Sequence, residues 1–149
     1  MMTTTVKQVL QGKSSQIHTL SPDNTVYEAL EAMANLKISA VLITEGGHLV
    51  GIFTERDYAR KVALQGRKSS ETRVGDLMTR NLLTISPRQM LDDVMQMMTE
   101  NRIRHLPVVE QGKLIGIVTI GDAVKAVMDE QQHTIDQLSS YIAGDITTV

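Results

Sequence analysis

Apolar and polar positions follow one succession of patterns, and that succession occurs twice along the chain. Each copy begins with a short apolar segment (17–20, then 82–85) that ends at Ser-Pro, a pair that ends a strand or opens a turn. A stretch with apolar residues three and four positions apart follows and predicts a helix. Two β-rich segments and a second helix, beginning at Thr54 or Thr119, complete the copy. Each copy therefore predicts the order β-α-β-β-α.

Local signals support these elements. Thr25 and Glu28 have the spacing of a capping box at the start of the first helix. Gly46-Gly47 and Gln111-Gly112 interrupt the β-rich segments and supply the positive φ angles that a hairpin turn needs. The apolar helix positions are Val26, Ala29, Leu30, Met33 and Leu36, then Leu91, Val94, Met95 and Met98. The fold class predicted is α+β with α/β-like layers, built from tandem units around a pseudo-twofold axis.

The duplication is visible residue by residue at a shift of 65. Of the 46 positions from Ile17/Leu82 to Val62/Val127, 13 are identical, where unrelated sequences of ordinary composition would share about three. We predict a first motif at 5–65, a second at 66–128 and a helical tail at 129–149. The tail is expected to be helical to about Tyr141 and to end near Gly144.

Composition narrows the classes of function. The chain has 149 residues, 42% hydrophobic and 21% charged, with a net charge of −2 and no cysteine. A missing basic excess and few aromatic residues argue against nucleic-acid binding. Zero cysteine excludes disulfides, thiolate metal sites and a cysteine nucleophile. No apolar run approaches membrane-spanning length, so the expectation is a cytoplasmic protein without a membrane partner.

The sharpest local feature is a T-x-x-D element that follows a strand in both copies, at Thr54–Asp57 and Thr119–Asp122. One interpretation is plain helix capping, for which threonine and aspartate suffice. The other is a ligand site, because a helix N-terminus offers N–H groups to an anion and a carboxylate accepts both hydroxyls of a ribose. Capping does not explain why a glycine precedes each threonine by three positions.

A second feature is the cationic stretch 101–107, with Arg102, Arg104 and His105 before Pro107. It is either a solvated charge cluster at a helix end or a phosphate clamp. The four histidines lack the spacing of a zinc site, and no catalytic or nucleotide-loop motif is present. We therefore predict no metal and no catalytic residue.

The duplicated unit, with its G-x-x-T-x-x-D end and the R-H-L-P-V-V strand, resembles the CBS motif. The chain as a whole is similar to a stand-alone CBS pair, or Bateman module, over residues 5–128. It most resembles small bacterial CBS-pair proteins and plant organellar single-pair CBS proteins. The resemblance implies two halves packed through their sheets with two clefts, and association into a flat homodimer.

The resemblance also implies the ligand and the site residues. Family members bind AMP, ADP, ATP, NAD(H) or S-adenosylmethionine, with the motif aspartate on the ribose. Each cleft is expected to combine the T-x-x-D of one unit with strands of the other. The first cleft would comprise Thr54, Arg56, Asp57, Leu82, Leu83, Arg104, His105 and Pro107. The second would comprise Thr119, Asp122, Ile17, Ser39 and Ala40. With three candidate cations, the Asp57 cleft is hypothesised to be the better phosphate site.

These observations leave several functions to weigh. The leading one is a non-catalytic regulatory module that senses adenosine nucleotides and signals to an effector protein or through self-association, with no catalytic cofactor. The alternative is a structural homodimer with vestigial nucleotide sites. An enzyme such as a nucleotide hydrolase is disfavoured, since no nucleophile, metal cluster or base is apparent. The tail is either a docking or dimerisation element or a helix that packs on its own module.

Overall fold

The chain folds into two compact units whose segments interleave along the sequence. The computed structural model describes residues 2–13 and 17–147, with side chains through residue 143. One unit comprises 16–84 and 107–116, and we call it the Asp57 unit; the other, the Asp122 unit, comprises 1–15, 85–106 and 117–149. The motif boundaries predicted from the sequence stay a prediction. Each compact unit contains segments from both repeats, so the units do not correspond to consecutive stretches of the chain.

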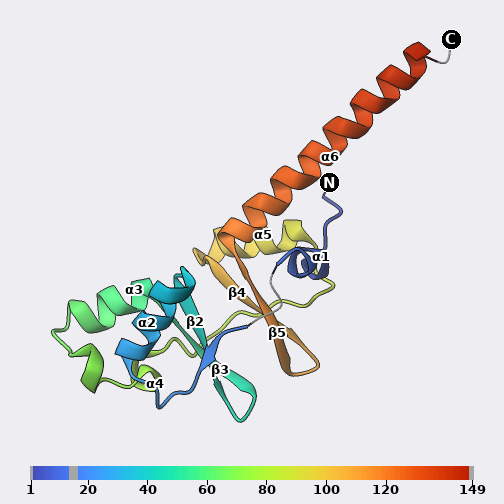
Figure 1. The fold of residues 1–149 in the computed structure, drawn as a ribbon. Coiled ribbons are helices and arrows are strands. Elements are labelled where there is room, and N and C mark those ends of the chain that lie inside the picture. The colour runs from blue at the N-terminus through green and yellow to red at the C-terminus, as the bar shows by residue number, and fades with distance from the viewer. Residues whose placement is uncertain (1, 14–16, 148–149) are drawn as a thin grey trace. The chain divides into compact units, whose positions relative to one another are not determined.

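The Asp57 unit is built on a three-stranded sheet in the order β1-β2-β3 (Figure 1). Strand β1 is parallel to β2, and β2 is antiparallel to β3. Its elements are β1 (Thr19–Leu20), α2 (Val26–Leu36), β2 (Ala40–Glu45), β3 (His48–Thr54), α3 (Glu55–Asp57), a wider helical segment (Tyr58–Ala63), a short turn of helix (Ser69–Glu71) and α4 (Val74–Leu77). The order β-α-β-β-α predicted for this repeat is confirmed.

The core of the Asp57 unit lies between α2 and the sheet. The helix buries Val26, Ala29 and Met33, which share one face because they are three and four positions apart. Leu36, predicted in the same stripe, is 48% exposed at the end of the helix. The core also includes Val41, Ile43, Phe53, Val62, Val74 and Met78.

Helix α2 begins as its sequence predicts. The Thr25 hydroxyl accepts a hydrogen bond from the N–H of Glu28 at 3.1 Å, and the Glu28 carboxylate accepts one from the N–H of Thr25 at 3.0 Å. This reciprocal capping lowers the pKa of Glu28, chiefly through the hydrogen bond from the Thr25 backbone. The helix ends at Leu36 and is capped by Lys37, whose φ of 55° is left-handed.

The second repeat forms a shorter sheet. Strands β4 (His105–Glu110) and β5 (Lys113–Thr119) pair as a hairpin, and the strand predicted at 82–85 is reduced to a single bridged residue, Ile85. In the first repeat, Leu42 pairs with Thr19 in the parallel ladder. The residue at the matching position is Pro107, which has no N–H to donate, so this edge of β4 is a poorer partner. Both hairpin turns have the expected positive φ angles, at Gly46, Gly47, Gln111 and Gly112.

The Asp122 unit combines three helices with the open end of that hairpin, residues 105–106 and 117–119. It contains α1 (Val6–Gln11), α5 (Leu91–Asn101) and α6 (Ile120–Thr147). Helix α5 buries Leu91, Val94 and Met98, as its spacing predicts. Helix α6 is one continuous helix and does not end near Gly144, so that prediction was wrong. A glycine inside a helix costs only about 1 kcal/mol relative to alanine, which an established helix tolerates.

Each repeat begins with a leading segment that packs on the helix of the other repeat. In the Asp122 unit, the N–H of Leu91 donates to the Thr4 carbonyl at 2.8 Å, and the N–H of Val6 donates to the Gln89 carbonyl at 2.9 Å. In the Asp57 unit, Val26 donates in the same way to Thr72 at 2.8 Å. Residues 4–6 thus play the part that residues 72–74 play in the other unit.

Candidate ligand-binding site

In both units the start of one hairpin strand lies beside the helix that follows the other strand. Ala40 pairs with Thr54 across β2 and β3, and the N–H of Glu55 donates to the Ser39 carbonyl at 3.0 Å. In the second repeat, the N–H of Ile120 donates to the Arg104 carbonyl at 2.8 Å. This arrangement follows from antiparallel pairing, which places the beginning of one strand opposite the end of the next.

The first T-x-x-D element forms a closed capping box. The Thr54 hydroxyl accepts from the N–H of Asp57 at 3.1 Å, and Oδ2 of Asp57 accepts from the N–H of Thr54 at 3.0 Å. Helix capping is therefore a real role of these residues. It leaves Oδ1 of Asp57 for other partners, because the capping box uses one carboxylate oxygen.

Two residues that the sequence analysis missed complete the surroundings of Asp57. The Thr79 hydroxyl lies 3.1 Å from Oδ1 and 3.3 Å from Oδ2, and Nζ of Lys61 lies 3.0 Å from Oδ1. Lys61 also donates to the Leu77 carbonyl at 2.9 Å. The spacing Asp57-x-x-x-Lys61 was a usable signal, since residues four apart on a helix face each other. The side chain of Asp57 is only 10% exposed.

Gly51 explains how Thr79 reaches the aspartate. The N–H of Thr79 donates to the Ile52 carbonyl at 2.8 Å, and the N–H of Ile52 donates back at 3.0 Å. A Cβ on Gly51 would lie 2.5 Å from Sδ of Met78 and 3.1 Å from the Thr79 carbonyl oxygen. The glycine is needed because the segment that carries Met78 and Thr79 crosses β3 at close range. This answers why a glycine precedes Thr54 by three positions.

The second T-x-x-D element has different partners. The N–H of Thr119 donates to Oδ2 of Asp122 at 2.9 Å, and the Thr119 hydroxyl accepts from the N–H of Asp122 at 3.1 Å. Nζ of Lys13 lies 2.6 Å from the same Oδ2 and 2.8 Å from the Ile117 carbonyl oxygen. Lys13 comes from the leading segment after α1, so sequence proximity offers no hint of it. The Asp122 side chain is 21% exposed, twice the value for Asp57.

The ionisable groups of the Asp122 unit influence one another. Burial acts to raise the pKa of Asp122, but the hydrogen bonds from Lys13 and Thr119 and the Lys13 charge outweigh it, and the pKa falls below its ordinary value. His105 is half-buried, and burial followed by the charges of Arg104 and Lys13 lowers its pKa, against the opposing pull of Asp122. His105, Arg104, Lys13 and Asp122 therefore form one electrostatic cluster, which we call the Asp122 cluster.

The remaining predicted site residues are distributed between the units. Arg56 is exposed on α3 beside Asp57. Ile17 and Leu82 are half-buried, Leu83 is 42% exposed, and Pro107 is buried in β4. Except for Arg104 and His105, which belong to the Asp122 unit, the residues predicted around Asp57 lie in the Asp57 unit.

The contacts within each unit add neighbours that the predicted grouping did not include. Arg104 and His105, predicted for the Asp57 cleft, lie beside Asp122 in their own unit. Ser39 and Ala40, predicted for the Asp122 cleft, lie beside Thr54 in theirs. These neighbours follow from antiparallel pairing within each hairpin, which places the start of its first strand opposite the end of its second. The sequence analysis did not use this pairing. Sharing of a cleft between units stays a prediction.

The described part of the chain offers neither a metal site nor a membrane-spanning helix. Within 2–13 and 17–147, no group of three or more His, Asp or Glu side chains is placed to hold a metal ion. Over the same part of the chain, no helix is both long and apolar enough to cross a membrane.

The fold and the paired T-x-x-D elements define a tandem repeat module, and comparison with known proteins identifies its class. The CBS domain family model matches residues 4–64 and again 74–129, so the chain belongs to the CBS-domain family and carries a pair of these domains. It has the fold of a CBS pair with an added C-terminal helix.

Among curated proteins, the chain is 42% identical to the mitochondrial CBS domain-containing protein CBSX3 of Arabidopsis thaliana, over 95% of this chain and 73% of that protein. It is 34% identical to the CBS domain-containing protein YhcV of Bacillus subtilis, over 91% of this chain and 89% of that protein. These relatives match the predicted resemblance to small bacterial and plant organellar CBS-pair proteins.

Solved structures agree with the fold. A CBS-domain protein from Burkholderia ambifaria aligns with a TM-score of 0.82 and 47% identity, over 86% of this chain and 96% of that one. The CBS-domain containing protein ATU1752 from Agrobacterium tumefaciens aligns with a TM-score of 0.78 and 42% identity, over 83% and 98%. The likeness covers nearly the whole of each solved chain.

Proposed function

We propose that this CBS pair is a non-catalytic regulatory module that binds an adenosine nucleotide (AMP, ADP, ATP or NAD) at the starts of α3 and α6. The observation that carries the proposal is the Asp122 cluster. It combines a carboxylate suited to a ribose diol with three cationic or protonatable side chains and the N-terminal N–H groups of a long helix. Membership of the CBS family supports the same ligand class.

The carboxylates of Asp57 and Asp122 have different partners, which a bound ligand would have to displace. Asp57 already accepts from Thr54 and Thr79 and is paired with Lys61, and it is the more enclosed. Asp122 is more exposed, and its cationic partner is Lys13. We therefore assign the principal nucleotide phosphate site to the Asp122 cluster. This replaces the hypothesis that favoured Asp57, since two of the three cations counted there lie beside Asp122.

Binding at Asp122 would act on the rest of the unit through Lys13. A ribose diol on Oδ2 competes with Nζ of Lys13, which is also held by the Ile117 carbonyl. Lys13 follows α1 directly, and Thr4 and Val6 connect that leading segment to α5. The leading segment would then have two arrangements, one with Lys13 bound to Asp122 and one with Lys13 released. A nucleotide that competes with Lys13 binds the second arrangement more tightly, and this difference in affinity is what a population shift requires. The output would be altered self-association or contact with an effector protein.

Nucleotide-dependent stabilisation tests the proposal. A thermal-unfolding panel with AMP, ADP, ATP, NAD⁺ and S-adenosylmethionine should raise the melting temperature for at least one nucleotide, because a ligand of the native state stabilises it by mass action. Calorimetry should then show that Asp122→Ala weakens binding more than Asp57→Ala. Asp136→Ala, an exposed aspartate of α6, is the matched control. No shift with any nucleotide would favour the alternative, a structural homodimer with vestigial sites.

A catalytic outcome is tested with the same samples. The proposed module binds a nucleotide without changing it, so AMP or ATP recovered after prolonged incubation should be intact. Turnover that disappears in Asp57→Ala or Asp122→Ala would overturn the non-catalytic assignment.

A further inference from the structure

The second half of α6 is a helix without a neighbour in the described structure. Every side chain from 131 to 143 is exposed, and Figure 1 shows this part of α6 beyond the ends of α5 and α1, the other helices of its unit. Several of these side chains are large and apolar, although a solvated helix face is normally polar. The exposed apolar residues of α6 are Val124 (45%), Met128 (63%), Ile135 (54%), Leu138 (58%), Tyr141 (69%) and Ile142 (59%).

Most of these residues form one straight seam. Val124, Met128, Gln131, Ile135, Leu138 and Ile142 are separated alternately by four and three positions, which is the heptad spacing of a coiled coil. Met128, Ile135 and Ile142 occupy the a positions, while Val124, Gln131 and Leu138 occupy the d positions. In the second half of the seam, Ile135 and Ile142 at a with Leu138 at d follow the pattern of β-branched a and leucine d residues that favours two parallel strands.

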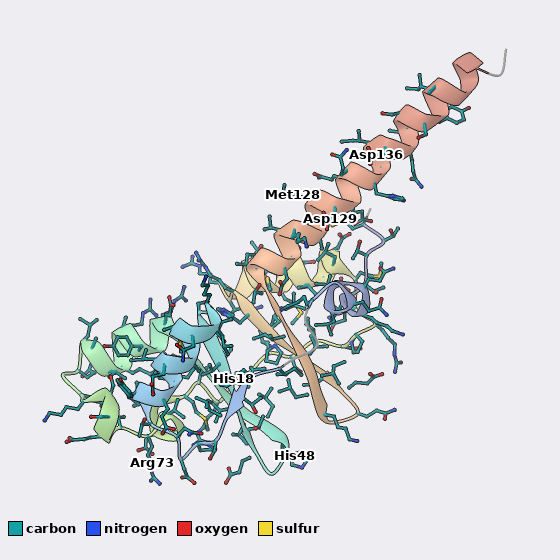
Figure 2. The ribbon with its side chains drawn as sticks, in the orientation of Figure 1. His18, His48, Arg73, Met128, Asp129 and Asp136 are labelled. Carbon is teal, nitrogen blue, oxygen red and sulfur yellow. The ribbon has the colours of Figure 1, made fainter. Side chains whose placement is uncertain are left out.

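Charge around the seam decides between possible occupants. From Ala126 to the C-terminus the chain has no lysine or arginine. Of its four acidic residues, Asp129, Glu130 and Asp136 occupy positions outside the seam, and Asp145 follows the end of the seam at Ile142 (Figure 2 labels Asp129 and Asp136). A helix that lies on an anionic membrane has a basic polar face, so this composition disfavours a lipid surface. Glu130 is held by Thr3 and Thr4 of its own unit.

The positions that flank the seam permit pairing with an identical helix. In a parallel pair these e and g positions of the two helices meet, and like charges there would repel. Here they are Lys125, Gln132 and Ser139 on one side and Val127, Thr134 and Tyr141 on the other. A single charge among six leaves no repulsive pair. The seam residues are also self-complementary, since each layer would place a residue against its own copy.

We propose that α6 pairs with α6 of a second copy of this chain as a parallel, in-register, two-stranded coiled coil along Val124–Ile142. The seam is about 28 Å long at 1.5 Å per residue, so the contact is short and should depend on protein concentration. Gln131 supplies one polar layer between Met128 and Ile135, and the in-register arrangement places its amide opposite its own copy, where the two amides can hydrogen-bond. The inference is independent of nucleotide binding, because it uses neither aspartate motif.

Engineered cysteines give a direct test in this cysteine-free chain. Met128→Cys and Ile142→Cys, each made alone in the full chain, should form cross-linked dimers under mild oxidation several-fold faster than Ser140→Cys, which lies outside the seam. An antiparallel pair along the same seam would place Met128 against Leu138, so it would leave the single variants uncross-linked but link a mixture of Met128→Cys and Leu138→Cys. That result, or equal rates for all three variants, would overturn the proposal.

Disruption of the seam provides the complementary test. Ile135→Glu combined with Leu138→Glu should abolish cross-linking through Met128→Cys, whereas His133→Glu with Ser140→Glu, outside the seam, should preserve it. Circular dichroism checks that α6 stays folded in both variants. Nucleotide-induced melting shifts should be the same in both, which separates failure of this inference from failure of the proposed function. Persistent cross-linking in the seam variant, or binding of the unmodified chain to phosphatidylserine vesicles in place of self-association, would refute it.

Discussion

Nζ of Lys13 lies 2.6 Å from Oδ2 of Asp122, although 109 residues separate them in the chain. This ion pair joins the leading segment of the molecule to the first turn of α6, within the Asp122 unit. In the Asp57 unit it is Thr79 that joins a distant segment to the motif, because its hydroxyl contacts Asp57. The two motifs are thus alike in backbone and different in the chemistry that surrounds the carboxylate.

Replacement of Lys13 should destabilise the Asp122 unit at neutral pH. Lys13→Met keeps the aliphatic stem but leaves Asp122 without its cation, and the expected loss is about 1 kcal/mol for a partly exposed charged hydrogen bond. Lys7→Met, at an exposed position of α1, is the control. Urea unfolding of the two variants measures the difference. An unfolding free energy equal to that of the unmodified chain would show that the pair contributes nothing.

The same pair predicts an acid dependence. The pKa of Asp122 is lowered in the folded state, so its ionised form contributes stability that is present above the ordinary aspartate pKa and is lost as the pH falls through the lower folded value. The gap in stability between the unmodified chain and Lys13→Met should therefore be full near neutral pH and should narrow below about pH 4. Urea midpoints recorded across this range measure it. A gap that is constant with pH would contradict an electrostatic origin.

Removal of the Thr79 hydroxyl should weaken the Asp57 unit. Thr79→Val retains the shape but removes a donor to a buried carboxylate, with an expected cost of about 2 kcal/mol. Thr79→Ser keeps the hydroxyl and should lose much less. If Thr79→Val unfolds at the same urea concentration as the unmodified chain, the hydrogen bond contributes nothing. A loss in Thr79→Ser larger than that in Thr79→Val would show instead that packing of the methyl group matters more.

Much of the fold was predictable because local signals determine it. Helix spacing, the Thr25–Glu28 capping box and the glycine turns each act within a few residues. The partners of the two aspartates were not predictable in this way. Repeat spacing is 65 from Ile17 onward, but hydrogen bonding makes Thr4 the counterpart of Thr72, a spacing of 68. The first repeat therefore has three more residues between Thr4 and Ile17 than the second has between Thr72 and Leu82. Alignment of the repeats at one fixed shift does not extend to Lys13, which lies in this longer segment.

The grouping of the site residues could have been predicted better. Antiparallel pairing of β4 with β5 requires that Arg104 and His105 lie near Thr119, whatever the packing of the units. The Asp57–Lys61 spacing likewise predicts an i,i+4 pair. The segment 82–85 keeps only one bridged residue, Ile85, and Pro107 offers a reason, because it removes a ladder donor from β4.

Gly51 should be intolerant of any side chain. In Gly51→Ala the new methyl would meet Sδ of Met78 at 2.5 Å, and relief by movement of that side chain is limited by the Thr79 carbonyl at 3.1 Å. Overpacking of this kind costs about 1–3 kcal/mol. A double-mutant cycle with Met78→Ala separates the two contacts. Complete recovery of the Gly51→Ala loss in the Met78→Ala background would assign the strain to Met78 alone, whereas partial recovery shows that the Thr79 backbone shares it.

Nucleotide binding at the Asp122 cluster should take up a proton. In the free protein, burial and the charges of Arg104 and Lys13 lower the pKa of His105, which favours the neutral imidazole. A bound phosphate group adds negative charge and raises that pKa, so affinity should increase as the pH falls through the ordinary histidine range. NAD⁺ is the best probe, because its diphosphate does not titrate there, while the phosphate of AMP has a pKa of about 6.

The variants His105→Gln and Arg104→Gln distinguish protonation from simple charge attraction in this binding. His105→Gln should remove the pH dependence of the NAD⁺ dissociation constant, measured by calorimetry between mildly acidic and mildly alkaline pH. Arg104→Gln removes a charge that does not titrate in this range, so it should weaken binding at every pH and leave the slope in place. An unchanged slope in His105→Gln would show that another group takes up the proton. A flat profile in the unmodified chain would place the phosphates away from His105.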